Sequence, residues 1–290
     1  MRSSATALAP ALRPHQWSKN LLVFAPLAAS HNLFRVDLLT TCALAFAAFS
    51  LCASASYILN DIFDADADRQ HPRKRRRPFA ARAVSQRTGL VTAAVLLAAS
   101  GALSLYSGSW RLAGVLGLYL VTTTAYTFWL KQLPVADVFT LTGLYVLRIV
   151  AGGVATGTLL SEWFLAFALF FFLSLAFVKR YVELLATNGQ LPARDYGPDD
   201  APWMHAVGTS AGYMAVVVLA LYVNAPDVTA LYARPDVLWL LCPVLLFWIT
   251  RLWFRAGRRL VHDDPVVETL RDPFSYAVLA AASVILIAAV

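Results

Sequence analysis

The sequence predicts an all-α, polytopic membrane protein. Hydrophobic residues make up 59% of the 290 residues and charged residues only 14%, and the mean hydropathy is +0.62. A soluble domain is typically about 45–50% apolar and about 25% charged. The apolar excess is spread along the whole chain, so a water-soluble fold of this length could not cover it with polar surface. Helices that cross a lipid bilayer are therefore the expected architecture.

Apolar runs of sufficient length recur along the chain. A helix needs about 20 apolar residues to cross the hydrocarbon core. Residues 1–17 are polar and are expected to form a cytoplasmic N-terminal segment ahead of a single transmembrane domain. The first candidate is short and contains His31. Nine spans are expected, at 18–34, 37–60, 88–107, 110–130, 135–157, 160–184, 203–224, 236–255 and 273–290.

The charges fall on one side of these spans. Of the 24 Lys and Arg residues, 20 lie on one side, three on the other, and Arg148 lies inside a span. This asymmetry predicts that the N-terminus and the long loops face the cytoplasm. The same side carries 13 of the 17 carboxylates, which topology does not require. We therefore expect a binding surface for a charged compound from the cytosol.

The densest carboxylate cluster follows the second span. On a helix at about 100° per residue, Asn60, Asp61, Asp64 and Asp68 share one narrow face, and Asp66 lies on the other side. Three like charges on one face repel each other unless a cation joins them, and oxygen ligands suit Mg²⁺ together with substrate phosphates. The alternative interpretation is a solvated acidic helix end, balanced by the basic run after it.

Several cations could bind phosphate. Five consecutive basic residues follow the acidic cluster, and Lys74 and Arg77 are our candidates among them. A lipid-headgroup patch is the alternative. Arg148 lies mid-span, where a charge is costly and indicates function, unless it is a structural partner of Asp137 or Glu183. Lys179 and Arg180 form a second pair of candidate phosphate-binding cations. A group of acids could supply additional ligands or could belong to a solvated loop: Asp263, Asp264 and Asp272.

These motifs together resemble the UbiA superfamily of intramembrane prenyltransferases, and within it the branch of decaprenyl-phosphate phosphoribosyltransferases. The resemblance rests on residues 13–20 (RPHQWSKN), 57–68 with 71–75, 148–156, 161–165 and 179–184 (KRYVEL), and it is less clear beyond Leu184. Aromatic-prenylating members usually carry a second DxxxD motif after the sixth span. This sequence has KRYVE there, which replaces one carboxylate by two cations and fits a site with more phosphate to neutralise.

The resemblance implies a UbiA-like helical bundle in a bacterial-type inner membrane, with its active site facing the cytoplasm. It implies Mg²⁺-dependent transfer of 5-phosphoribose from phosphoribosyl diphosphate to a polyprenyl phosphate. The alternatives are an isoprenoid transfer from a prenyl diphosphate to an aromatic or quinone precursor, and a non-enzymatic transporter or lipid-binding scaffold. No nucleic-acid partner is expected, and a homo-oligomer is left open. Asp61, Asp64, Asp68 and Asn60 would hold Mg²⁺, and the substrate-binding candidates are Lys19, Asn20, Tyr57, Asn60, Lys74, Arg77, Arg148, Lys179, Arg180, Tyr181 and Glu183.

Overall fold

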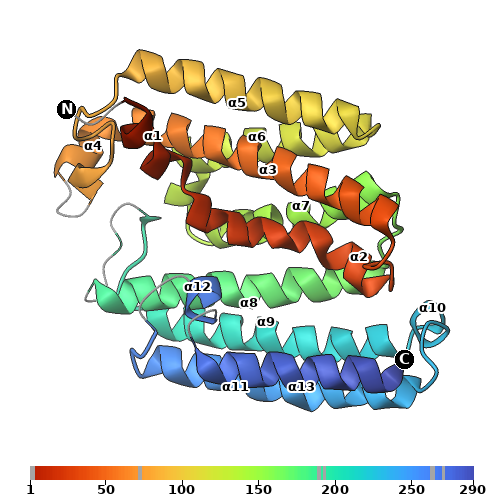
Figure 1. The fold of residues 1–290 in the computed structure, drawn as a ribbon. Helices are drawn as coiled ribbons and strands as arrows, with labels where there is room; N and C mark the ends of the chain where they lie inside the picture. The colour runs from red at the N-terminus through yellow and green to blue at the C-terminus, as the bar shows by residue number, and fades with distance from the viewer. Residues whose placement is uncertain (1–3, 71–73, 188–190, 192–193, 262–264, 270–271) are drawn as a thin grey trace. The chain divides into compact units, whose positions relative to one another are not determined.

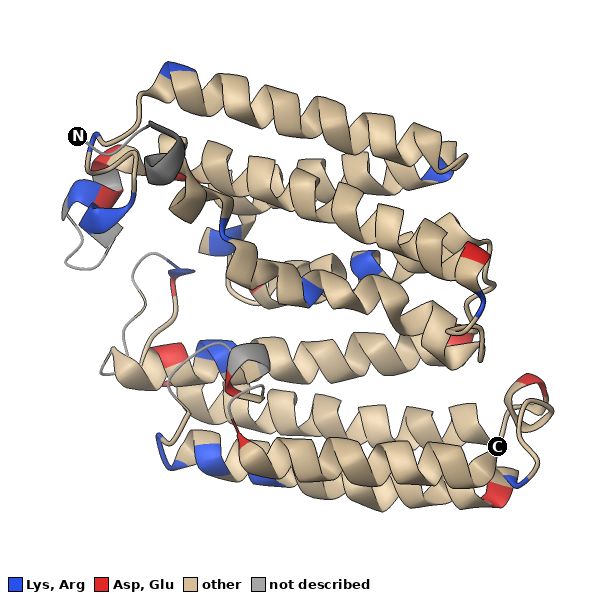
Figure 2. Ribbon diagram, viewed as in Figure 1, with Lys and Arg blue, Asp and Glu red and all other residues tan. Residues whose placement is uncertain are grey.

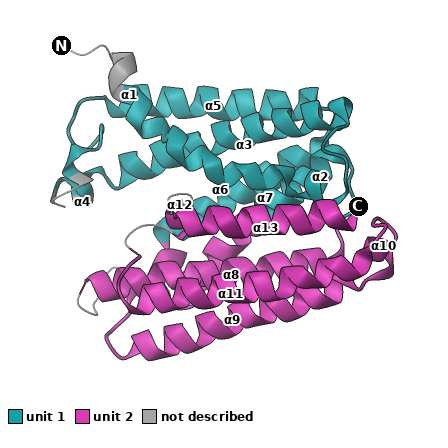
Figure 3. Cartoon of the chain, turned by 60° about the horizontal axis from the view of Figure 1, so that its bottom comes forward, with its two compact units in different colours: residues 1–128, 147–159 teal, residues 129–146, 160–290 magenta. Residues whose placement is uncertain are grey.

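The computed structural model describes residues 4–70, 74–187, 191, 194–261, 265–269 and 272–290, and the described chain is helical throughout (Figure 1). Its contacts divide it into two compact units (Figure 3). Unit 1 comprises residues 1–128 and 147–159, and unit 2 comprises residues 129–146 and 160–290. Helix α7 (Ala136–Thr156) contributes its first half to unit 2 and its second half to unit 1.

Unit 1 is built around the long helix α3 (Val36–Phe63), which packs against α5 (Gln86–Tyr106). Ser85 caps α5 by accepting a hydrogen bond from the Thr88 amide at 3.1 Å. The remaining elements of unit 1 are α1 (Ser4–Leu12), η1 (Pro14–Phe24), α2 (Ala25–Ala29), α4 (Ala65–Gln70), η2 (Lys74–Arg76) and α6 (Trp110–Phe128).

Close backbone approach holds η1 against α7 in unit 1. A Cβ atom at Gly152 would lie 1.9 Å from the carbonyl oxygen of Val23, so only glycine fits at this position. Gly152 therefore permits the close contact between η1 and α7.

Unit 2 is centred on the pair α8 (Glu162–Ala186) and α9 (Asp200–Val223). Ser174 donates to the carbonyl of Gly208 at 2.7 Å and accepts from the Trp253 indole at 3.0 Å. A side chain at Gly208 would collide with the Trp253 ring, so this glycine lets α9 and α11 pack closely. The remaining elements of unit 2 are η3 (Leu130–Gln132), α10 (Pro226–Thr229), η5 (Pro235–Leu240), α11 (Leu241–Gly257), α12 (Pro265–Thr269) and α13 (Pro273–Ala289).

The predicted all-α membrane class is confirmed, but the number of nine spans is not. Six described segments are long and apolar enough to cross a membrane, and α13 is shorter at 17 residues. The first expected span, 18–34, is divided between η1 and α2, where Pro26 lacks an amide donor. Within each unit the charged residues lie mainly near the ends of the long helices (Figure 2). The six segments are Val36–Phe63, Gln86–Tyr106, Ala136–Thr156, Glu162–Ala186, Asp200–Val223 and Pro235–Gly257.

Candidate functional site

The acidic motif lies where α3 passes into α4 in unit 1. Asp64 separates the two helices, but its amide donates to Asn60 at 2.9 Å and the Asp68 amide donates to Asp64 at 2.8 Å. Helical spacing is therefore kept through the junction. Asp61 and Asp68 are 2% and 4% exposed, whereas Asp66 is exposed and pairs with Arg69. The expected division of the carboxylates into two faces matches this geometry.

Two arginines join the buried carboxylates. Arg13 donates to Asp61 at 2.5 Å. One nitrogen of Arg77 lies 2.7 Å from Asp68 and 3.2 Å from Asp61, so it occupies the space between the two carboxylates. We call Arg13, Asp61, Asp68 and Arg77 the carboxylate cluster. The Arg13 guanidinium also lies over the ring of Tyr57, 5.1 Å from its centroid.

The donor set of the carboxylate cluster suits Mg²⁺. Among the described residues no group of three or more His, Cys, Asp or Glu side chains is arranged to enclose a metal. Magnesium in phosphate sites usually takes only one or two carboxylates and completes its shell with water and substrate oxygens. The carboxylates of Asp61 and Asp68 both contact one nitrogen of Arg77, so a cation bound in place of that nitrogen would contact both. Asp64 is half-buried beside them, and the side chain of Lys74 lies outside the described part of the chain.

Arg148 belongs to a second polar network in unit 1. It is 4% exposed and its Nε donates to Asn20 at 2.9 Å. Its guanidinium lies 5.1 Å from the ring centroids of both Phe49 and Tyr119. Asn20 in turn donates to Ser50 at 3.0 Å. The guanidinium thus contacts an amide oxygen, the Tyr119 hydroxyl at 3.4 Å and two aromatic faces. The alternative of a structural partner in Asp137 or Glu183 stays a prediction.

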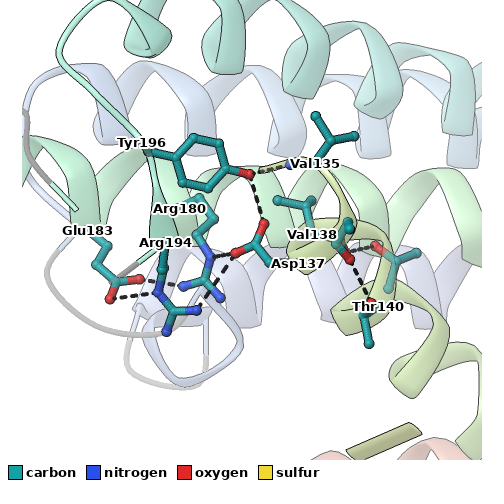
Figure 4. A network of polar contacts seen from close by, with 10 residues as sticks. Val135, Asp137, Val138, Thr140, Arg180, Glu183, Arg194 and Tyr196 are labelled. Atoms are coloured by element: carbon teal, nitrogen blue, oxygen red, sulfur yellow. Dashed lines mark hydrogen bonds and ion pairs between the residues drawn. The ribbon is translucent and has the colours of Figure 1, made fainter. Parts of the chain in front are cut away.

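A third network lies in unit 2 and is centred on Asp137, which is fully buried (Figure 4). Arg180, 1% exposed, bonds to Asp137 and to Glu183. Arg194 lies 3.8 Å from Asp137 and 3.6 Å from Glu183. The Tyr196 hydroxyl donates to Asp137 at 2.8 Å and accepts from the Val135 amide at 2.8 Å. We call Asp137, Arg180, Glu183, Arg194 and Tyr196 the Asp137 network.

The Asp137 network ties the connection between α8 and α9 to the start of α7. Tyr196 is anchored further by an antiparallel bridge to Leu191. Burial, and to a smaller degree the adjacent Asp137 carboxylate, raises the pKa of Tyr196. The hydroxyl therefore stays protonated at neutral pH and keeps donating to Asp137.

Three further candidates, Lys19, Lys179 and Tyr181, are not part of the Asp137 network as defined above. Tyr181 packs edge-on against His205 and beside Trp253, with ring centroids 5.5 Å and 5.8 Å away. Lys179 in α8 and Lys19 in η1 are half-buried. The structure therefore gathers Arg180 and Glu183 of the KRYVE motif into one network and places Tyr181 in an aromatic cluster.

Asp272 joins α11 to the start of α13. It accepts from Arg251 at 2.6 Å and from the Ser275 amide at 3.1 Å, so it caps α13. Hydrogen bonding from Arg251 lowers the pKa of Asp272 to about 2. Asp272 thus serves as a helix cap in an ion-pair group with Arg251 and Arg255. The candidates Asp263 and Asp264 lie outside the described residues.

Sequence reasoning did not select four residues that complete these networks. Arg13, Asp137 and Arg194 each bind a candidate that it did select, and Tyr196 binds Asp137. Asp137 follows a proline by three residues and opens a span, which is a usable signal for a buried acid at a helix start. Tyr196 lies in a polar connection and carries no comparable signal.

The six long apolar helices define an integral membrane protein of the all-helical class. Residues 21–267 match the model of the UbiA prenyltransferase family. The chain therefore belongs to the UbiA prenyltransferase family and is a transferase.

Similar proteins support this assignment at different levels. The protein y4nM of Sinorhizobium fredii is 37% identical over 91% of this chain, and the chain spans about half of that protein's length (52%). The decaprenyl-phosphate phosphoribosyltransferase of Mycobacterium tuberculosis is 44% identical over 182 residues, which cover 60% of this chain and 59% of that protein. A UbiA homologue from Archaeoglobus fulgidus, solved with GPP and Mg²⁺, has the same fold with a TM-score of 0.69 at 17% identity, over 98% of this chain and 95% of that chain.

Proposed function

We propose that this transferase moves 5-phosphoribose from phosphoribosyl diphosphate to a polyprenyl phosphate, at the cytoplasmic side of a bacterial inner membrane. The observation that carries the proposal is the pairing of the buried carboxylates Asp61 and Asp68 with two arginines. Such a site offers both metal ligands and phosphate ligands. The 44% identity to a decaprenyl-phosphate phosphoribosyltransferase over part of the chain supports the same donor and acceptor.

The number of phosphate groups favours this reaction over isoprenoid transfer. Phosphoribosyl diphosphate carries a diphosphate and a separate 5-phosphate, and the acceptor brings a third anionic group. Guanidinium groups bind phosphate oxygens in pairs. Arg13 and Arg77 in unit 1 and Arg194 in unit 2 are partly exposed at 22%, 26% and 22%. An aromatic acceptor without phosphate would need fewer such cations.

We assign the steps to the chain's own groups as follows. Asp61 and Asp68, with Asp64 and Asn60, would hold a Mg²⁺ ion, which when bound would supply positive charge to neutralise the departing diphosphate. Arg13 and Arg77 then exchange their carboxylate partners for diphosphate oxygens. The bond between ribose C1 and the diphosphate oxygen breaks, and an anionic oxygen of the acceptor phosphate bonds to C1. No strong general base is required, because the acceptor oxygen already carries its charge.

The cations among the remaining substrate-binding candidates would bind the other anionic groups of the two substrates. A prenyl diphosphate stays the alternative donor, because the UbiA homologue from Archaeoglobus fulgidus was solved with GPP and Mg²⁺. The substrate-binding candidates outside the carboxylate cluster are Lys19, Asn20, Tyr57, Lys74, Arg148, Lys179, Arg180, Tyr181 and Glu183.

The proposal is tested with purified protein, ribose-labelled phosphoribosyl diphosphate and polyprenyl phosphate in detergent. We expect labelled lipid that requires Mg²⁺ and that falls to background when the metal is chelated. Asp64→Asn is expected to give little product, whereas the exposed Asp66→Asn should retain it. No labelled lipid from the wild-type protein, or full product from Asp64→Asn, would overturn the assignment.

A further inference from the structure

A groove lies between α3 and α6 within unit 1, and its open space of about 300 Å³ includes the solvent at its mouth. The end of α3 that carries the acidic motif forms one wall, and the last turns of α6 form the other. Five of the side chains that line the groove are polar and uncharged. These are Ser56, Asn60, Thr123, Thr124 and Thr127.

The hydroxyl of Thr123 is enclosed and forms no hydrogen bond of good geometry among the residues that the structure describes, and the Tyr119 side chain lies nearby. The other three hydroxyls donate to carbonyls one turn earlier: Ser56 to Cys52 at 3.0 Å, Thr124 to Leu120 at 2.8 Å and Thr127 to Thr123 at 2.9 Å. Each of these keeps free acceptor capacity. A buried hydroxyl without a partner is costly, so the Thr123 hydroxyl indicates that a polar ligand completes the groove.

An aromatic pair also lines the groove. The rings of Phe63 and Phe128 meet edge to face, with centroids 5.1 Å apart, and both residues line the groove. Binding sites for small molecules commonly combine such apolar walls with a few placed polar groups. A sugar ring needs this combination, because its C–H face packs on apolar surface while its hydroxyls form hydrogen bonds.

The groove adjoins the face of α3 that carries the carboxylates. At about 100° per residue, Ser56 and Phe63 lie about 40–60° to one side of Asn60, and Asp64 lies about 40° to the other side. Asn60 therefore borders both the groove and the proposed metal site. A group bound in the groove would lie beside a diphosphate held by the carboxylates.

We infer that the groove between α3 and α6 is the subsite for the pentose ring of a sugar-diphosphate donor, with Thr123 and Asn60 bonding to ribose hydroxyls. This inference rests on the proposed function and deepens it by naming the residues that select the donor. In phosphoribosyl diphosphate the ribose is bonded directly to the diphosphate, so the two must occupy adjacent subsites. An isoprenoid chain in the same groove would leave the Thr123 hydroxyl buried without a partner.

The matched variants are Thr123→Val, which removes the hydroxyl and keeps the side-chain shape, and Thr122→Val, which makes the same change at the neighbouring position of α6 outside the groove lining. We expect Thr123→Val to raise the KM for phosphoribosyl diphosphate about three- to tenfold, the effect of one neutral hydrogen bond. Thr122→Val should leave the KM unchanged.

Donor analogues that lack either the 2-hydroxyl or the 3-hydroxyl of ribose provide a measurement that does not depend on a variant's folding. The wild-type protein should discriminate against one of them, and Thr123→Val should lose that discrimination. Turnover of phosphoribosyl diphosphate with an unchanged KM in Thr123→Val and no discrimination in the wild type overturns the subsite alone. No wild-type turnover of phosphoribosyl diphosphate overturns the subsite and the proposed function together.

Discussion

The carboxylate cluster of unit 1 and the Asp137 network of unit 2 both pair arginines with buried carboxylates, but they differ in the exposure of the arginine nearest the central carboxylate. Arg13 and Arg77 are 22% and 26% exposed beside Asp61, whereas Arg180 is 1% exposed beside Asp137 and the more distant Arg194 is 22% exposed. A partly exposed arginine can change partners at modest cost, but a buried one cannot leave its carboxylate without a large desolvation penalty. The first arrangement is suited to exchange ligands, and the second is suited to hold a loop in place.

The largest expected effect is on catalysis in the carboxylate cluster. Asp61→Asn keeps the side-chain shape but removes a metal ligand and leaves Arg13 and Arg77 with one carboxylate fewer. We expect transfer of labelled phosphoribose to fall by about 100-fold or more, measured as labelled lipid per minute. Asp66→Asn is the matched control, because Asp66 is exposed and pairs only at the surface with Arg69. Equal losses in both variants would remove the distinction between the two acidic faces.

The next effect is on folding in the Asp137 network. Asp137→Asn leaves the buried Arg180 without its main charge partner, and we expect a loss of about 3–5 kcal/mol in stability. Thermal unfolding of the detergent-solubilised protein measures it. Asp199→Asn, an exposed acid in the same connection, should change stability by less than about 0.5 kcal/mol. A stable Asp137→Asn protein that has lost only activity would show that this network also takes part in the chemistry.

A smaller effect is expected at Tyr196. Tyr196→Phe removes the hydroxyl that links Asp137 to the Val135 amide. We expect a loss of about 1–3 kcal/mol, because the buried Asp137 carboxylate and the Val135 amide each lose a partner. Protease cleavage in the connection between α8 and α9 should accelerate in the variant. Unchanged cleavage would show that the Tyr196 hydroxyl does not hold this connection in place.

The smallest effect is a pH dependence at Asp272, which lies outside both networks. Its pKa is lowered to about 2 from 3.8, so its stabilising contribution is present above about pH 3.8 and is lost as the pH falls toward 2. The melting temperatures of wild type and Asp272→Asn should therefore differ at about pH 5 and converge near about pH 2. A gap that stays constant over this range would show that the carboxylate charge contributes nothing.

The helices were largely predictable from sequence, because length and hydropathy determine which segments can cross a bilayer. The expected spans 37–60 and 160–184 correspond to Val36–Phe63 and Glu162–Ala186. The segment 18–34 was not predictable as a 3₁₀ helix followed by a short α-helix. Hydropathy does not report the backbone break around Pro26, or the contact between Gly152 and Val23 that fixes η1.

The site was predictable only where local periodicity determines it. Helical spacing placed Asp61 and Asp68 together, because they lie within two turns of one another. Their partner Arg13 lies 48 residues from Asp61 along the chain, and the partners of Asp137 lie 43 and 59 residues away. Such pairings arise from tertiary packing, on which a single sequence carries no local signal.

Donor choice tests the central claim most directly. Purified protein is offered ribose-labelled phosphoribosyl diphosphate and labelled geranyl diphosphate in separate reactions, each with Mg²⁺, polyprenyl phosphate and an aromatic acceptor. We predict that label enters lipid from the ribose donor alone and depends on the polyprenyl phosphate. Transfer of the geranyl group to the aromatic acceptor, without turnover of phosphoribosyl diphosphate, would contradict the account and establish an isoprenoid transferase.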